Sequence, residues 1–248
     1  MAFGKSSNPA LNKKIFDNAL ERSTDEVMTI NGTVHKTFLL LLLVIVSASL
    51  TWKMVLTGAA VGTWIAIGGI GGFITAIVTI FNKKLSPYLS PLYALLEGLF
   101  LGGISAFFAE AFTGLIIIQA VVLTFGILFT LLFAYRTGLI KATSGFKRGV
   151  IAATGGVALL YVATWILQIF GINVAFMHDG GLLSIVISLV IIVIAALNLI
   201  LDFNFIEEGA KAGAPKYFEW YAAFGLIVTI IWLYLEILRL LSYFTGRN

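Results

Sequence analysis

The chain has 248 residues, of which 60% are hydrophobic and 11% are charged, and its formal net charge is +4. An ordinary soluble domain has roughly 45–50% apolar and about 25% charged residues, so this composition excludes a soluble globular protein. The sequence has no cysteine, which excludes disulfide scaffolds, thiolate metal sites and cysteine nucleophiles. Its basic residues fall in short clusters between apolar runs, so they indicate membrane topology and not a nucleic-acid surface.

Residues 1–36 are polar, and we expect them to form a separate amino-terminal segment. Asn8-Pro9 is typical of a helix start, and Leu11 and Ile15 follow at four-residue spacing. This pattern predicts a short amphipathic helix on the membrane surface, although a solvated tail fits the same residues. No short basic stretch leads directly into an apolar run, so we expect no cleaved signal and a retained first span.

Seven segments are long and apolar enough to cross a bilayer core of about 30 Å, which requires about 20 residues of helix. They are residues 37–56, 58–81, 88–109, 114–134, 149–170, 181–206 and 218–243. Only Lys53 and the region of Gly58 separate the first two, so six spans are the alternative. Uninterrupted apolar runs lack the alternation of a barrel. The sequence therefore predicts an all-α polytopic membrane protein, a bundle of seven transmembrane helices over residues 37–248.

Charge and small residues predict the topology and the packing of these helices. With seven spans, thirteen of the sixteen Lys and Arg residues fall in segments on the same side of the membrane as the amino terminus. The positive-inside rule therefore predicts a cytoplasmic amino terminus. Closely spaced small residues let helices approach each other, and we expect them to serve packing within the chain more than dimerisation. Glycines recur at this four-residue spacing in the pairs Gly58 and Gly62, Gly68 and Gly72, and Gly98 and Gly102.

Acidic residues inside apolar runs are informative, because an ionisable side chain within a span costs about 2.5–3.5 kcal/mol on insertion scales. Glu97 lies near the middle of the third span, whose helix has no basic residue. It is therefore either protonated at neutral pH or paired with a group from another helix. A structural hydrogen bond and a functional proton or cation site both fit Glu97.

The last two spans carry polar faces. Asp202 lies near the end of the sixth span with Asn198 one turn earlier, which predicts a polar stripe in which Asp202 either anchors the helix or serves a function. Glu236 and Arg239 can form an ion pair within the last helix; if Arg239 instead reaches the outer surface, Glu236 can carry a proton or bind a cation. We expect their face to look into the bundle. It follows spacings of three and four through Gly225, Thr229, Trp232, Glu236, Arg239 and Tyr243.

Enzymatic chemistry is not expected from these residues. No His or Cys lies inside a predicted span, and no Ser has a nearby base. The pair His178-Asp179 in a loop cannot build a metal site alone, and the motifs that flank an intramembrane aspartyl pair are missing. We therefore expect no enzyme activity, no cofactor and no resident metal.

Four stretches carry a family likeness, and it covers most of residues 37–245. They are residues 90–105 (SPLYALLEGLFLGGIS), the turn Leu201-Asp202-Phe203, residues 219–226 (EWYAAFGL) and residues 232–241 (WLYLEILRLL). Together they resemble the bacterial branch of the Bax inhibitor family, also called the transmembrane Bax inhibitor motif family. The resemblance implies a seven-helix fold with a central last helix, a location in the bacterial cytoplasmic (inner) membrane and, as in characterised relatives, a pH-sensitive calcium leak.

In those relatives an Asp near the end of the sixth helix couples to a second Asp in the seventh. Asp202 matches the first position. For the second position, aligning the Leu-Tyr-Leu-acid string selects Glu236, whereas aligning the terminal Leu-Arg-Leu-Leu string selects Thr229. We favour Thr229, because that register keeps the helix lengths more nearly equal. Thr at this position departs from the acid pair of the relatives and removes the repulsion between two carboxylates. Glu236 lies two turns further along, about 10 Å by helix rise, and Glu97 is an alternative partner for Asp202.

The leading hypothesis is a passive cation leak, with Ca²⁺ as the favoured ion, gated by protonation of intramembrane carboxylates. Asp202, Glu97, Glu236, Asn198 and Thr229 could supply the oxygen ligands that suit Ca²⁺. Ionised Asp202, paired across helices, would hold the cytoplasmic end closed, and protonation or cation binding would shift the population toward an open state. One rival is a non-conducting regulator that binds a membrane protease or another membrane protein through its amino-terminal segment. The other is a proton-coupled transporter of a small solute.

Overall fold

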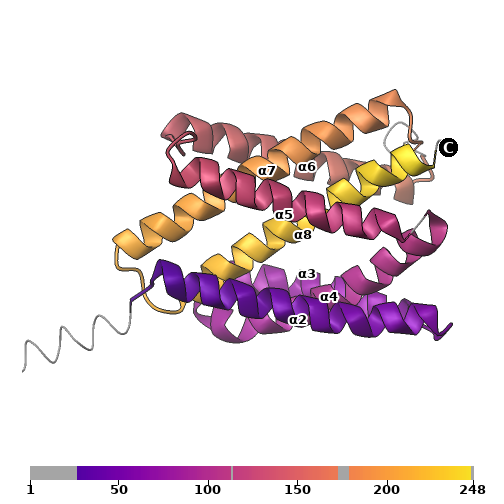
Figure 1. The fold of residues 1–248 in the computed structure, drawn as a ribbon, viewed down its shortest axis with the longest axis horizontal. Helices are drawn as coiled ribbons and strands as arrows, with labels where there is room; N and C mark the ends of the chain where they lie inside the picture. Colours follow the sequence, from indigo (N-terminus) through magenta and orange to yellow (C-terminus); the bar gives the residue numbers. More distant parts are fainter. Residues whose placement is uncertain (1–26, 113, 173–178, 247–248) are drawn as a thin grey trace, which may run out of the picture.

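The computed structural model describes residues 27–112, 114–172 and 179–246, and within them seven helices are long and apolar enough to cross a membrane. The predicted all-α membrane bundle is therefore confirmed. The helices are α2 (Ile30–Leu56), α3 (Gly62–Phe81), α4 (Ser86–Ala111), α5 (Leu115–Arg136), α6 (Ser144–Ile169), α7 (Leu182–Lys211) and α8 (Phe218–Thr245), and the short 3₁₀ helix η2 (Lys83–Leu85) leads into α4. Helices that follow one another in the chain run in opposite directions, so α2, α4 and α8, which pack against each other, run the same way (Figure 1).

Local capping and turn geometry set the ends of the first two helices. α2 begins before the predicted first span, because the Thr29 hydroxyl accepts a hydrogen bond of 2.9 Å from the Gly32 N–H and so caps the helix. Gly58 has a φ of +69°, a conformation that favours glycine, and the chain turns there between α2 and α3. The six-span alternative is therefore wrong. The amphipathic helix expected around Leu11 and Ile15 lies outside the described residues.

α8 is the central helix of the bundle. It packs against α2, α4, α5 and α7 (Figure 1), and 56% of its most apolar stretch is buried. One hydrophobic core, which includes Leu199 and Leu233, joins α8 to α5 and α7. A second core, which includes Leu40 and Ile227, joins α8 to α2 and α4. The expected central position of the last helix is thus confirmed, and groups on α8 are placed to interact with both halves of the bundle.

Glycines allow α2 and α3 to pack closely on α4. A Cβ at Gly98 or Gly102 of α4 would overlap the α2 backbone, and a Cβ at Gly68 of α3 would overlap the α4 backbone. The predicted packing within the chain is confirmed at these positions. The predicted packing role is wrong for Gly58 and Gly62, where an added Cβ would meet no atom within 4 Å. Gly58 lies in the turn before α3, and Gly62 is the first residue of α3.

Candidate functional site

Asp202 lies on α7 and faces the central helix. An added Cβ at Gly225 of α8 would stand 3.9 Å from Asp202 Oδ1, and the Thr229 side chain lies within hydrogen-bonding reach of the carboxylate. Asp202 Oδ2 is shielded from solvent and has no hydrogen-bond partner among the described residues. Because an ionised carboxylate is costly to withdraw from water without a partner, Asp202 is the first candidate for a functional acid.

The face of α8 opposite Asp202 is small and polar. Gly225 has no side chain, which leaves space beside the carboxylate, and Thr229 follows one turn later. The Thr229 hydroxyl is 3.2 Å from the Gly225 carbonyl oxygen, to which it can also donate. The structure thus places Asp202 opposite Thr229, the residue that the terminal Leu-Arg-Leu-Leu alignment selects. At Gly225 and Thr229, the polar face predicted for α8 therefore faces the interior of the bundle.

Glu236 belongs to a different group of residues, two turns further along α8. It is 2% exposed and accepts hydrogen bonds from the Tyr161 hydroxyl of α6 at 2.5 Å and from Arg239 Nη1 at 3.3 Å. Arg239 Nη1 also donates to the Tyr161 hydroxyl at 2.8 Å. The ion pair expected within the last helix is therefore formed, and Tyr161 is a third member that the sequence did not indicate. Glu236 is bonded toward α6 and not toward Asp202.

The remaining candidate residues face other helices. Asn198 Nδ2 donates to the Thr154 hydroxyl of α6 at 2.7 Å, so the predicted polar stripe on α7 divides between α6 and α8. Residues one turn apart on a helix point about 40° apart, which is enough to direct Asn198 and Asp202 to different neighbours. Glu97 is half-buried on α4 and faces α3, where a Cβ at Gly72 would meet its carboxylate. Glu97 is therefore not the partner of Asp202.

The model of the family described as Bax inhibitor 1 like matches residues 8–246, which is nearly the whole chain. The chain belongs to the Bax inhibitor family. A comparison with curated proteins gives no match. Of the four stretches that carry the family likeness, one lies in α4, one surrounds Asp202 in α7, and two lie in the central helix α8.

Among the described residues of this Bax inhibitor family protein, the acid with the most bonds is Glu219, which was not among the candidates predicted from the sequence. It lies in the first turn of α8 and is fully buried. Its Oε1 accepts hydrogen bonds of 2.9 Å from both the N–H and the hydroxyl of Thr29 and lies 3.0 Å from Lys216 Nζ, while Oε2 is bonded by Lys36 Nζ. These four residues are called the Glu219 cluster. A Cβ at Gly32 would overlap the Glu219 carboxylate, so only glycine fits there.

The Glu219 cluster joins the start of α2 to the turn between α7 and α8. Beside it, Val27 forms a β-bridge with Pro215, and the buried Met28 donates its N–H to the Ala214 carbonyl oxygen at 2.7 Å. An acid in the first turn of a helix is favoured by the helix dipole, which is the one signal the sequence offered. The decisive partner, Lys36, lies 183 residues away in the chain, so only the fold reveals the pair.

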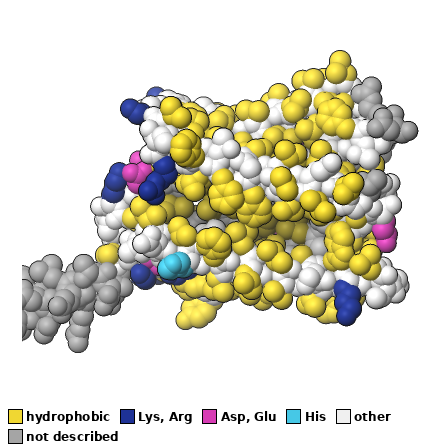
Figure 2. Space-filling model, in the orientation of Figure 1, with side chains coloured by type: hydrophobic (Ala, Val, Ile, Leu, Met, Phe, Trp, Pro, Cys, Tyr) yellow, Lys and Arg dark blue, Asp and Glu magenta, His cyan; other side chains and the backbone are white. Residues whose placement is uncertain are grey.

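Charged side chains gather at the end of the bundle where α2 begins (Figure 2). Lys147 of α6 pairs with Glu208 of α7 at 2.7 Å, and Lys211 pairs with Glu207 at 2.5 Å. The Tyr135 hydroxyl of α5 donates to Glu207 at 2.5 Å. These contacts connect α5, α6 and α7 at the end of the bundle where α2 begins.

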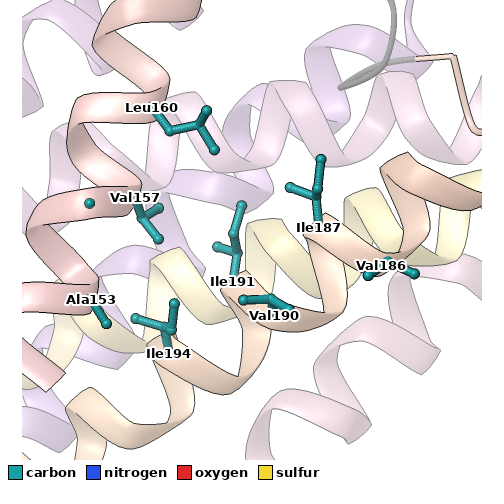
Figure 3. Close-up of a pocket in the computed structure, with 9 residues that line it drawn as sticks. Ala153, Val157, Leu160, Val186, Ile187, Val190, Ile191 and Ile194 are labelled. Atoms are coloured by element: carbon teal, nitrogen blue, oxygen red, sulfur yellow. The ribbon is translucent and has the colours of Figure 1, made fainter. Parts of the chain in front are cut away.

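A cavity of about 330 Å³ lies between α6 and α7. Figure 3 shows apolar side chains that point into it from both helices, among them Val157, Leu160 and Ile191. Its lining contains no acid, amide or hydroxyl group. Because cations such as Ca²⁺ require oxygen ligands, this cavity is not part of the candidate ion site.

Proposed function

We propose that this membrane protein passively conducts cations, with Ca²⁺ as the principal ion, and that protonation of Asp202 controls conduction. The observation that carries the proposal is Asp202 Oδ2, which is shielded and unpartnered among the described residues beside Gly225 and Thr229 of the central helix. The resemblance to relatives with a pH-sensitive calcium leak supports the same ion and a control by Asp202, with Thr229 in place of the second Asp of those relatives.

The mechanism follows from the cost of an ionised carboxylate in a membrane span. That cost is several kcal/mol on insertion scales, and either a proton or a cation at the free oxygen removes it. The Asp202 carboxylate and the Thr229 hydroxyl are adjacent oxygen groups from two different helices, and oxygen groups are the ligands of Ca²⁺. Proton and cation thus compete for one position between α7 and α8, and each shifts the balance between closed and open arrangements.

The site suits transient passage of an ion. Within the described residues no three His, Cys, Asp or Glu side chains come together as a metal site. Conduction requires positions that bind an ion weakly enough to release it, and one carboxylate with one hydroxyl meets that condition. We therefore propose a leak without enzymatic activity or a resident cofactor.

We further propose that the end of the bundle where α2 begins faces the cytoplasm and that the membrane is the bacterial inner membrane. With seven spans, thirteen of the sixteen Lys and Arg residues fall in segments on the same side of the membrane as the amino terminus. The positive-inside rule expects this excess in cytoplasmic segments. Asp202 precedes Lys211, the last residue of α7, by about 14 Å of helix rise. In a core of about 30 Å, an ion entering from the cytoplasm meets Asp202 before the midplane.

The test is calcium entry into liposomes that contain a calcium dye, from about pH 5.5 to about pH 8. Asp202→Asn keeps the size of the side chain and removes its titration, so it should abolish the pH dependence of the flux. Glu110→Gln is the matched control, because Glu110 is exposed near the end of α4 and should not affect flux. A pH dependence that survives Asp202→Asn would contradict the gating, and folded protein without flux above empty liposomes would contradict conduction.

A second candidate function is a regulator that binds a membrane protease or another membrane protein. The contact of the amino-terminal segment with the turn between α7 and α8 supports it. Val27 is bridged to Pro215, and Thr29 belongs to the Glu219 cluster, so the amino-terminal segment is attached to the turn between α7 and α8. A truncation must therefore end before Val27 to spare the fold. Removing residues 1–26 should leave ion flux intact and abolish partner capture, whereas loss of flux would argue against a separate role for this segment.

A further inference from the structure

A groove of about 410 Å³ runs between α2 and α5, with α4 and α8 as its floor. The two wall helices each pack against α4 and α8 but are not packed along each other. Figure 2 shows the face of the molecule hollowed between them, so the groove opens sideways, toward the lipid. We call it the α2–α5 groove. Its walls include Trp52 of α2 and Val121 of α5.

The lining of the α2–α5 groove is apolar, and its few hydroxyl groups are already bonded within the protein. Ser105 and Tyr234 are hydrogen-bonded to each other at 2.7 Å. Thr124 and Ser49 each donate to a carbonyl oxygen of their own helix at 2.7 Å. No charged residue lines the groove. A polar substrate would lose its hydration there without replacement hydrogen bonds, and an apolar cavity does not retain water, so the occupant is hydrocarbon.

We propose that the α2–α5 groove is a binding site for one acyl chain of a bilayer phospholipid. Its volume of about 410 Å³ equals about 14 groups of the size of a water molecule, at about 30 Å³ each, and a methylene group is of similar size. A chain of ordinary membrane-lipid length therefore fills it. One turn of an α-helix about 10 Å wide and about 5.4 Å long already occupies about 400 Å³, as much as the whole groove, so the volume of the groove matches one acyl chain better than a transmembrane helix of another protein.

The end of α2 provides a place for the headgroup. Trp52 lines the groove four residues before α2 ends at Leu56, and the next residue, Lys53, is exposed. Trp and Lys are typical of the membrane–water interface, where Trp lies at headgroup depth and Lys extends its ammonium toward water. A lipid whose chain enters beside Trp52 brings its phosphate to the level of Lys53 along the helix axis. The apolar lining and the cation at its end together favour a phospholipid.

The experiment uses the full chain in liposomes that contain a phospholipid with a photoreactive diazirine on its acyl chain. After irradiation and digestion, mass spectrometry locates the attached lipid. Val121→Trp fills the groove from its α5 wall. Val122→Trp is the matched control, because Val122 is 63% exposed and is not part of the groove lining. Circular dichroism and size-exclusion chromatography establish that both variants are folded.

We expect labelling to concentrate on the groove walls of α2 and α5, to be lost in Val121→Trp and to persist in Val122→Trp. Labelling spread evenly over the lipid-facing helices, or equal in the two variants, would overturn the proposal. A size-exclusion profile that shifts to a smaller species in Val121→Trp but not in Val122→Trp would mean that a second chain occupies the groove, and would likewise overturn the proposal. Lys53→Glu should reduce labelling by the phospholipid and spare labelling by a neutral diacylglycerol probe; equal effects on both probes would refute the headgroup assignment.

Discussion

The contact between Glu219 and Lys36 is expected to hold the amino-terminal end of the bundle together. Glu219 is fully buried, and the Lys36 side chain is 18% exposed, whereas the second basic partner, Lys216, is 47% exposed. Solvent therefore screens the contact with Lys36 least. Lys36→Met removes the charge and keeps most of the side-chain length, so it isolates the electrostatic contribution of this residue.

The expected magnitude follows from the other contacts of Glu219. Removing one member of a buried ion pair costs about 3–5 kcal/mol when the remaining charge has no other partner. Here Lys216 at 3.0 Å and two hydrogen bonds of 2.9 Å from Thr29 remain on Oε1. We therefore expect Lys36→Met to lower the free energy of unfolding by about 2–3 kcal/mol. At roughly 2–4 °C per kcal/mol, the Tm falls by about 4–12 °C.

The assay is thermal unfolding of the purified protein in detergent for Lys36→Met, Glu219→Gln and the double variant. Because the two residues contact each other, the double variant should be more stable than the sum of the single effects predicts, with a coupling energy of about 1–2 kcal/mol. Lys211→Met is the control, since Lys211 is 72% exposed in its ion pair and such pairs contribute about 0.3–0.5 kcal/mol. Additive single effects, or a Lys36→Met effect no larger than the control, would contradict a stabilising contact between Lys36 and Glu219.

Three further contacts can be tested by substitution. Thr229→Asp places a second carboxylate beside Asp202, and the repulsion between the two should change the pH dependence of calcium flux in liposomes; an unchanged profile would contradict their proximity. Tyr161→Phe removes the hydroxyl that bonds the ion pair of α8, and thermal unfolding should show a loss of about 1–3 kcal/mol. Gly102→Ala should destabilise by about 1–3 kcal/mol through overlap with α2, whereas Gly126→Ala, where an added Cβ meets nothing, should be neutral or stabilising.

Much of the fold could be predicted, because a span is a local property of the sequence. The length and hydropathy of each segment located all seven helices, with differences only at their ends. The start of α2 was missed because the capping contact of Thr29 with Gly32 outweighs the polar residues of the first turn. The ion pair of Glu236 with Arg239 could also be predicted, since residues three apart on a helix are neighbours.

The partners between helices could not be predicted in the same way. Sequence reasoning selected Asp202, Asn198 and Glu97 correctly as polar groups within spans, but it could not decide which helix each one faces. The structure directs them to α8, α6 and α3 respectively. It also adds Glu219, whose main partner Lys36 is remote in the chain.

The class of protein, the positions of the apolar segments, the distribution of charge and the family follow from the sequence alone, because these depend on composition, on runs of about 20 residues and on short motifs. The contacts between helices come from the fold: Asp202 meets Thr229, Tyr161 completes the Glu236 pair, and α2 and α5 leave a groove between them. The physical reason is that the bilayer selects helices one at a time by hydropathy. The rotation and neighbours of each helix are instead set by packing and hydrogen bonds between segments far apart in the chain.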